Sequence, residues 1–276
     1  MPAGFSPRLT ASLALLAAAV MAIPSPAAAQ PRLSIGGDLG YAPSYVWRGV
    51  TRSERLVLTP AAFVRLDAGA NVLSAGAWSA VEMRKASPGT LTLRPPDEWG
   101  PGELDLWAQY TRHVARTDVS LGVVRYVFAD NAPATEAYLQ IWPDSLPIPI
   151  DLRGAAYVGL EGDHPAYAEV EASHSFSLIP LPSGPPSLLV GATAGFSLNA
   201  PDDARPVRFA DTGPTHLMLG ATLLIPVNRT TAHIGVRHQR SFDEAARQLA
   251  PGRESDHRTW GEFGVSYVIG TPRKAK

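Results

Sequence analysis

The chain contains no cysteine, and its charges nearly balance. None of the 276 residues is a cysteine. This excludes disulfide bonds, cysteine-based metal or redox sites and a lipidated cysteine. The formal net charge is -1, so there is no polybasic surface of the kind that binds nucleic acid. After the N-terminal region, no stretch approaches the roughly 18 apolar residues that indicate a membrane-spanning helix. These absences leave a chain that must build its structure from shorter segments.

The first 29 residues have the pattern of a secretory signal peptide. Arg8 supplies positive charge, residues 11–23 form a mostly apolar run, and Ala27-Ala28-Ala29 fits the small-x-small cleavage rule. A transmembrane anchor is the alternative, but the run is shorter than the roughly 20 residues that a spanning helix needs. We therefore expect residues 1–29 to be cleaved and residues 30–276 to form one domain.

Twelve segments of the remaining chain alternate apolar and polar residues. In the segment 103–114, for example, Leu104 and Leu106 fall on one face while Asp105 and Gln109 fall on the other. A period of two is typical of β-strands with one apolar face. The expected strands are 32–42, 56–67, 72–83, 103–114, 119–128, 135–142, 150–160, 166–178, 188–198, 216–225, 231–239 and a last strand ending at residue 269. The pattern predicts an all-β fold, an antiparallel transmembrane β-barrel of about 12 strands.

The connections between these segments differ in length. Short turns follow the second, fourth and tenth strands, and long loops follow the first, third, ninth and eleventh. Short periplasmic turns and long extracellular loops are the rule in outer-membrane barrels, and an even strand number brings both mature termini to the periplasm. A soluble periplasmic sandwich or lipocalin-like barrel would also alternate. We disfavour it because the apolar faces are rich in Ala, Val and Leu and contain few large aromatic residues.

The last strand resembles the C-terminal insertion signal of bacterial outer-membrane barrels. Its sequence from Glu262 to Ile269 reads polar, any, Gly, any, any, aromatic, any, apolar, with Gly264, Tyr267 and Ile269 at the defining positions. The resemblance implies insertion into the outer membrane of a Gram-negative bacterium. It also implies three partners: the barrel assembly machinery, outer-membrane lipid and lipopolysaccharide.

The polar faces of the expected strands carry more acids than bases. These candidate pore-lining residues are Asp38, Arg65, Asp67, Glu103, Asp105, Gln109, Glu136, Asp151, Arg153, Glu169, Glu171, Arg237 and Glu262. An acid-rich lumen favours cations or polar neutral solutes. The alternative is a plugged barrel, in which Arg65, Arg153 and Arg237 bridge acids across the lumen and nothing passes.

The segment after the first strand, Ser44 to Ser53, resembles a signature near the start of the TorF-like porin family. The matching residues include Tyr45, Trp47, Arg48 and Gly49, while Arg52 stands where the family usually has Gln. The resemblance covers about ten residues and implies an outer-membrane, porin-like protein. Arg48 could fold over the pore mouth and pair with a lumen acid. We favour a structural corner, in which Gly49 allows an unusual backbone angle and Arg48 satisfies a carbonyl. In either interpretation Tyr45 and Trp47 suit the membrane interface.

No residue pattern indicates catalysis, a metal or a cofactor. His174 and Ser175 are adjacent on one strand, where neighbouring side chains point to opposite faces and cannot act together. The seven histidines show no metal-ligand spacing. We therefore expect a non-enzymatic, porin-like channel for passive diffusion of small polar solutes or ions, with a weak cation preference. The alternative is a closed structural or partner-binding barrel.

Overall fold

The computed structural model describes most of the chain after residue 29. The described residues are 30–87, 90–93, 102–128, 132–144, 146–161, 165–181, 184–199, 209, 212–244, 248–250, 253–254 and 256–270. The expected signal peptide and its cleavage site lie outside them. No described helix is long and apolar enough to cross a membrane.

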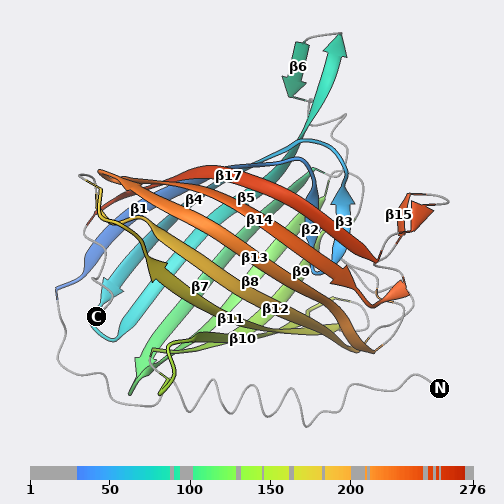
Figure 1. Ribbon diagram of the computed structural model, residues 1–276. Coiled ribbons are helices and arrows are strands. Elements are labelled where there is room, and N and C mark those ends of the chain that lie inside the picture. Colours follow the sequence, from blue (N-terminus) through green and yellow to red (C-terminus); the bar gives the residue numbers. More distant parts are fainter. Residues whose placement is uncertain are drawn as a thin grey trace.

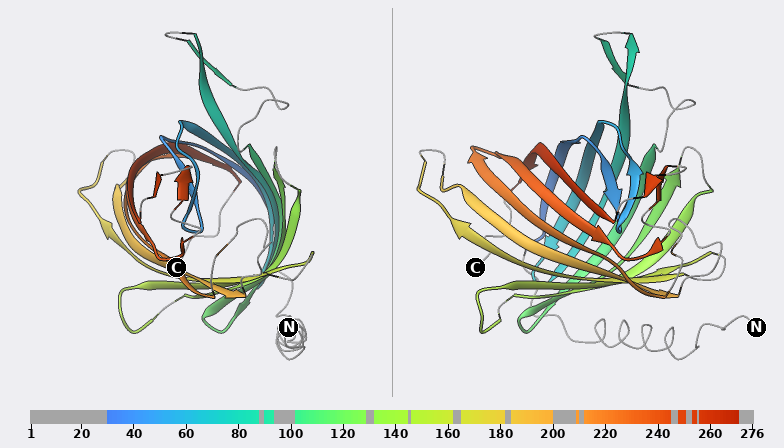
Figure 2. Two further views of the ribbon diagram at one scale, coloured as in Figure 1. Left: turned by 90° about the vertical axis from the view of Figure 1, so that its right-hand side faces the viewer. Right: turned by 45° about the vertical axis from the view of Figure 1, so that its right-hand side comes forward.

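Twelve antiparallel strands of the described chain close into a barrel (Figures 1 and 2). They are β1 (Arg32–Ala42), β4 (Val57–Ala68), β5 (Asn71–Ser87), β7 (Glu103–Val114), β8 (Thr117–Phe128), β9 (Ala134–Pro143), β10 (Asp151–Gly159), β11 (Ala166–Ser177), β12 (Ser187–Asn199), β13 (Gly213–Val227), β14 (Thr230–Ser241) and β17 (His257–Ile269). Each pairs with its neighbour in this order, and β17 pairs with β1. The predicted fold is confirmed, because no ring strand is left with a free edge.

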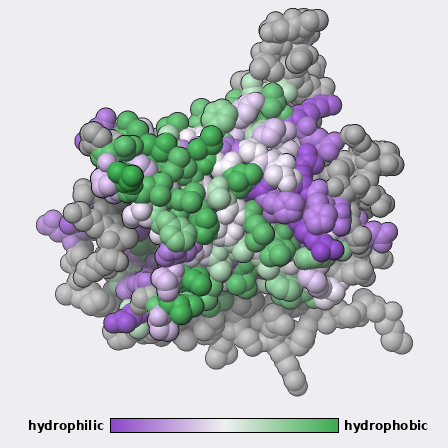
Figure 3. All heavy atoms as spheres, viewed as in Figure 1, coloured by the Kyte–Doolittle hydropathy of each residue, from purple (hydrophilic) through white to green (hydrophobic). Residues whose placement is uncertain are grey.

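The outer surface of the barrel is apolar. On β1, Leu33, Ile35 and Leu39 are 59%, 52% and 54% exposed, whereas Ser34 between them is 5% exposed. The same alternation recurs on other ring strands, and Figure 3 shows hydrophobic side chains over much of one face. A water-soluble barrel would turn these residues inward. The outward apolar band is that of a transmembrane barrel of the outer-membrane type.

Five short strands of the described chain are not part of the ring. Strand β6 (Thr90–Leu93) pairs with the end of β5, and the two project from one rim in Figure 1. Strands β15 (Gln248–Ala250) and β16 (Arg253–Glu254) form a small hairpin. Strands β2 (Tyr45–Trp47) and β3 (Val50–Ser53) form another hairpin, which lies inside the ring in the end-on view of Figure 2. The sequence pattern did not predict these elements.

Candidate functional site

The β2–β3 hairpin crosses the lumen as a single tight turn. Trp47 pairs with Val50, so Arg48 and Gly49 form a two-residue loop. Both have positive φ angles, 49° for Arg48 and 87° for Gly49. Positive φ at both central residues is the geometry of a type I′ turn, whose twist matches that of the flanking strands. A Cβ on Gly49 would lie 2.8 Å from the Cβ of His216, so glycine is required for the close approach to the wall as well.

Arg48 connects the tip of the hairpin to the facing wall of the barrel. Its Nη1 donates to Glu136 Oε1 at 2.8 Å and its Nη2 donates to Glu136 Oε2 at 2.6 Å, a bidentate ion pair. The side chains are only 6% and 3% exposed. Burial by itself would lower the pKa of the Arg48 guanidinium, but the Glu136 carboxylate outweighs it and raises that pKa above its ordinary value. The guanidinium therefore stays charged.

Aromatic rings surround the Arg48 guanidinium. Its Cζ lies 4.6 Å from the Trp47 ring centre and 4.4 Å from those of both Tyr157 and Tyr167. These are cation–π distances, and such contacts are stronger where water is excluded. Tyr126 adds a ring 5.1 Å from Trp47 and donates its hydroxyl to Glu136 at 2.8 Å. Together the rings and the carboxylate pack around the tip of the hairpin on the side of β8–β11.

Further hydrogen bonds hold the hairpin on other sides of the barrel. The Gly49 carbonyl accepts from the Gln239 amide and the Ser241 hydroxyl of β14, both at 2.8 Å. Tyr45 donates to Glu103 of β7 at 3.0 Å, and Ser53 donates to Glu82 of β5. Desolvation, reinforced by Glu103, raises the pKa of the Tyr45 hydroxyl well above its usual value, so it remains a proton donor. The hairpin is therefore attached to both halves of the wall.

These contacts correct the favoured interpretation of this segment. The corner exists, because Arg48 and Gly49 have positive φ. However, the Arg48 guanidinium binds a lumen carboxylate and not a carbonyl. Tyr45 is 8% exposed and packs against Trp78, and Trp47 packs against the ring of Tyr126, so neither lies at the membrane interface. The preference was wrong because an alternation pattern does not show whether a loop turns outward or into the barrel.

Two cavities flank the hairpin. One, of about 270 Å³, lies beside Arg48 and Gly49 and is lined by Tyr157, Glu169 and His216 among others. The larger, of about 460 Å³, lies between the hairpin and side chains of β1, β4, β5, β11–β14 and β17. The second cavity is lined by three carboxylates, Asp38, Glu171 and Glu262, against one guanidinium, Arg237, and one imidazole, His233. Its electrostatic balance is therefore acidic.

The residues expected to line a pore occupy three different environments. Glu103 and Glu136 are 1% and 3% exposed and hold the hairpin. Asp38, Glu171, Arg237 and Glu262 line the larger cavity, where Arg237 Nη2 lies 2.7 Å from Glu262. The others lie along the strands. Arg65 pairs with Asp67 at 2.7 Å, and Arg153 pairs with Glu169 at 3.3 Å. Gln109 accepts a hydrogen bond from Tyr138 at 3.0 Å, Asp105 has a buried carboxylate oxygen, and Asp151 is exposed. The inward arginines therefore pair with acids on their own or adjacent strands.

The expected insertion signal lies on the strand that closes the barrel. Gly264 of β17 is opposite Gly40 of β1 and His233 of β14, and a Cβ at Gly264 would lie 2.5 Å from His233 Nε2. Tyr267 and Ile269 are 39% and 50% exposed on the outer face. Glycine thus lets the His233 side chain cross inside β17, while the aromatic and apolar positions face outward.

Sequence reasoning missed the aromatic residues that face Arg48. Neither Tyr126 and Tyr157 nor Gln239 is among the candidate pore-lining residues that the sequence predicts. A run of inward tyrosines on successive strands, Tyr126, Tyr138, Tyr157 and Tyr167, was the available signal. This run indicates that aromatic rings crowd one side of the lumen, whereas the small inward residues of other strands leave more space.

No family profile and no curated protein sequence matches this chain. Among solved structures, the chain is similar to the porin NanC at a TM-score of 0.46, with 12% identity over 85% of this chain and 98% of that one. An outer-membrane channel from Pseudomonas putida F1 matches at 0.43, with 13% identity over 89% and 97%. The channel DcaP of Acinetobacter baumannii matches at 0.41, with 9% identity over 87% and 96%. These distant likenesses identify no solute and no site residue, and the TorF-like segment remains a resemblance.

Proposed function

We propose that this protein is a narrow, porin-like channel through which small polar solutes or ions diffuse across the outer membrane. The observation that carries the proposal is the hairpin fixed across the lumen, which leaves the larger cavity, of about 460 Å³, on one side of it. A cavity with a polar lining, placed to one side of the lumen, is not expected in a barrel that is simply closed. The solute path then follows this cavity along β1, β11–β14 and β17.

We further propose a weak cation preference for this path. The larger cavity presents three carboxylates against one guanidinium and one imidazole. Within a low-dielectric wall, such an excess of one sign attracts counter-ions and repels ions of like charge. Arg237 and Glu262 offset each other at 2.7 Å. Arg153 lies 3.6 Å from Glu171 and offsets part of its charge, so Asp38, 3.9 Å from the His233 imidazole, contributes most to the preference and Glu171 adds to it.

The second candidate is a closed barrel that serves a structural or partner-binding role. The observation in its favour is that the hairpin is held on several strands at once, at Glu136, Glu103 and Gln239. A loop attached at so many points does not move aside easily. In that case the long connections at the rim, and not the lumen, would be the functional surface.

The proposed function implies a cellular location for the barrel. We propose insertion in the bacterial outer membrane by the barrel assembly machinery, contact with lipid and lipopolysaccharide, and both mature termini in the periplasm. The apolar outer band and the terminal strand support this. Membrane fractionation with heat-dependent gel migration tests it, and recovery as a soluble periplasmic protein would contradict it.

Single-channel conductance in a planar bilayer separates the two candidates. The wild type is compared with a variant in which residues 45–53 are replaced by a Gly/Ser linker of equal length. A channel gives discrete currents in the wild type and larger ones in the linker variant, because the hairpin narrows the lumen. No current in the wild type, together with large currents in the linker variant, would establish the closed barrel. Gel migration of both proteins confirms that each is folded.

A further inference from the structure

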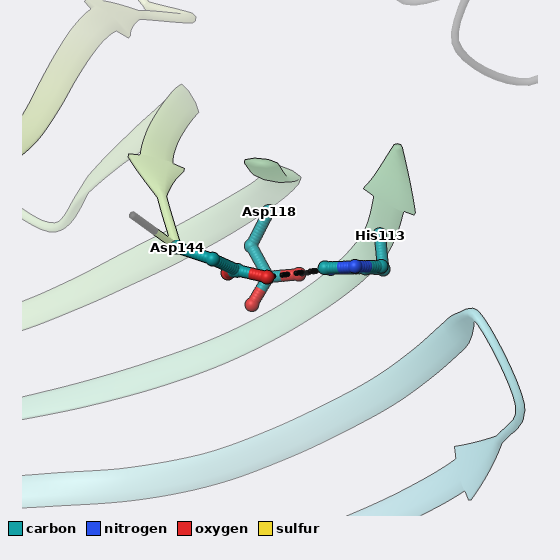
Figure 4. Close-up of side chains that lie close together, drawn as sticks. All are labelled: His113, Asp118 and Asp144. Carbon is teal, nitrogen blue, oxygen red and sulfur yellow. Dashed lines mark hydrogen bonds and ion pairs between the residues drawn. The ribbon is translucent and has the colours of Figure 1, made fainter. Parts of the chain in front are cut away.

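Three potential metal ligands converge at the barrel end that carries the short turns. They are the imidazole of His113 near the end of β7, the carboxylate of Asp118 near the start of β8, and the carboxylate of Asp144 just after β9 (Figure 4). His113 Nδ1 lies 3.0 Å from Asp118 Oδ1 and 3.4 Å from Asp144 Oδ2. In this group, one potential ligand atom from each residue lies within 4.8 Å of the other two.

The backbone holds these three residues in place without a metal. His113 is directly opposite Asp118 in the β7–β8 ladder, and the amide of His113 donates to the Ala70 carbonyl at 2.7 Å. The amide of Asp144 donates to the Arg116 carbonyl in the β7–β8 turn, also at 2.7 Å. The ligand atoms are therefore positioned by ladder and turn hydrogen bonds on three adjacent strands. Such positioning lowers the entropy cost of binding an ion.

The spacing and charge of the group match a divalent transition-metal ion. Ligands bonded to Zn²⁺ at about 2.0–2.1 Å in a tetrahedron are separated from each other by roughly 3.3 Å. Two of the three separations here, 3.0 and 3.4 Å, are close to that value. A neutral imidazole with two carboxylates carries a charge of -2, which a divalent ion balances. The mixed nitrogen and oxygen set favours Zn²⁺ over Ca²⁺ and Mg²⁺, which prefer all-oxygen sites.

We propose that His113, Asp118 and Asp144 bind one divalent transition-metal ion, which links the ends of β7, β8 and β9. The ion is coordinated by the Nδ1 lone pair of His113 and one oxygen of each carboxylate, and water completes its shell. All three side chains are accessible, at 27% to 44% exposure, so the ion can enter from the solution that the turns face. The site is separate from the lumen hairpin and independent of whether the channel conducts.

Calorimetric titration with ZnCl₂ tests this site in the detergent-solubilised full chain after treatment with a chelator. We expect one ion per chain in the wild type, and affinity more than about tenfold weaker in His113→Gln and in Asp144→Asn, each of which removes a ligand. His257→Gln is the matched control. His257 lies 3.4 Å from Asp256 at the opposite end of the barrel, and should leave zinc affinity unchanged.

Visible absorption of the Co²⁺-loaded protein gives a second, independent measurement. The wild type and His257→Gln should show the same coordination bands, and His113→Gln should lose them. Absence of zinc binding in the folded wild type would overturn the proposal and leave a simple His–Asp ion pair. Equal loss of binding in His257→Gln and Asp144→Asn would overturn it too, because it would show general surface adsorption. Gel migration identifies any variant that fails to fold.

Discussion

At the scale of single residues, the lumen is organised by one buried ion pair. Arg48 and Glu136 are 88 positions apart in the chain, and their side chains are almost fully shielded from water. Removing one partner of a buried pair leaves the other charge unpaired, which costs more than the pair itself contributes. Arg48 therefore holds the tip of the hairpin against β9, while Tyr45, Gly49 and Ser53 attach the hairpin to other strands.

We expect Arg48→Met to lower the free energy of unfolding by about 3–5 kcal/mol, because the Glu136 carboxylate is left buried without its cation. Urea titration of the barrel in detergent, followed by tryptophan fluorescence, measures the change. The double variant Arg48→Met/Glu136→Leu should recover much of the loss, because no unpaired charge remains. Equal losses in the single and double variants would show that the contacts to Trp47, Tyr157 and Tyr167 matter more than the charge.

Gly49 is the second residue on which the turn depends. Its φ of 87° is costly for any side chain, and an added Cβ would meet His216 at 2.8 Å. We expect Gly49→Ala to destabilise the barrel by about 1–3 kcal/mol. Gly154→Ala is the matched control, since nothing lies within 4 Å of its added Cβ. If both variants lose the same stability, strain in the turn is not the cause.

At the scale of elements, β17 has a role that its neighbours lack. It pairs with β14 on one side and with β1 on the other, so it is the strand that completes the ring. Its residues with even numbers face the lumen and include Glu262, while Phe263, Val265 and Tyr267 are 52%, 49% and 39% exposed outside. The assembly machinery can therefore contact the outward face of β17 before β17 pairs with β1 and closes the ring.

We expect Tyr267→Ala to reduce the amount of folded protein in the outer membrane without changing synthesis, because it removes the aromatic residue of the insertion signal. Val265→Ala, on the same outer face two residues earlier, should assemble normally. Quantitative gel migration of heated and unheated membranes measures the folded fraction. Normal assembly of Tyr267→Ala together with failure of Val265→Ala would show that the signal has been assigned to the wrong residue.

At the scale of the whole molecule, the hairpin divides the lumen into two unequal parts. Aromatic rings, Glu103 and Glu136 pack on the side against β7–β10, and the cavity of about 460 Å³, with Glu171 of β11 in its lining, lies on the other side. Selectivity should therefore depend on where an acid lies around the ring and not simply on its facing inward. This makes Asp38 and Glu171 more informative than acids on the packed side.

We expect Asp38→Asn/Glu171→Gln to reduce cation-over-anion selectivity, most clearly at low salt, where charges are least screened. Reversal potentials in a salt gradient measure the effect. Asp105→Asn is the control, because Asp105 does not line the larger cavity. A larger change in the control than in the double variant would place the solute path on the other side of the hairpin. Anion selectivity in the wild type would contradict the proposed charge balance.

The sequence alone determined the strands, their faces and the closed ring. Eleven expected starts and all expected ends agree with the ring strands to within a few residues, because a lipid-facing strand must alternate with period two and that period is visible locally. Only the tertiary structure decided that residues 45–53 turn inward and that Arg48 meets Glu136 and Gly49 meets Gln239, contacts 88 and 190 positions apart. Such contacts depend on which strands become neighbours around the ring, and no local pattern records that. For His113, Asp118 and Asp144 the deciding factor is the register of the consecutive strands β7, β8 and β9, which alternation alone does not fix.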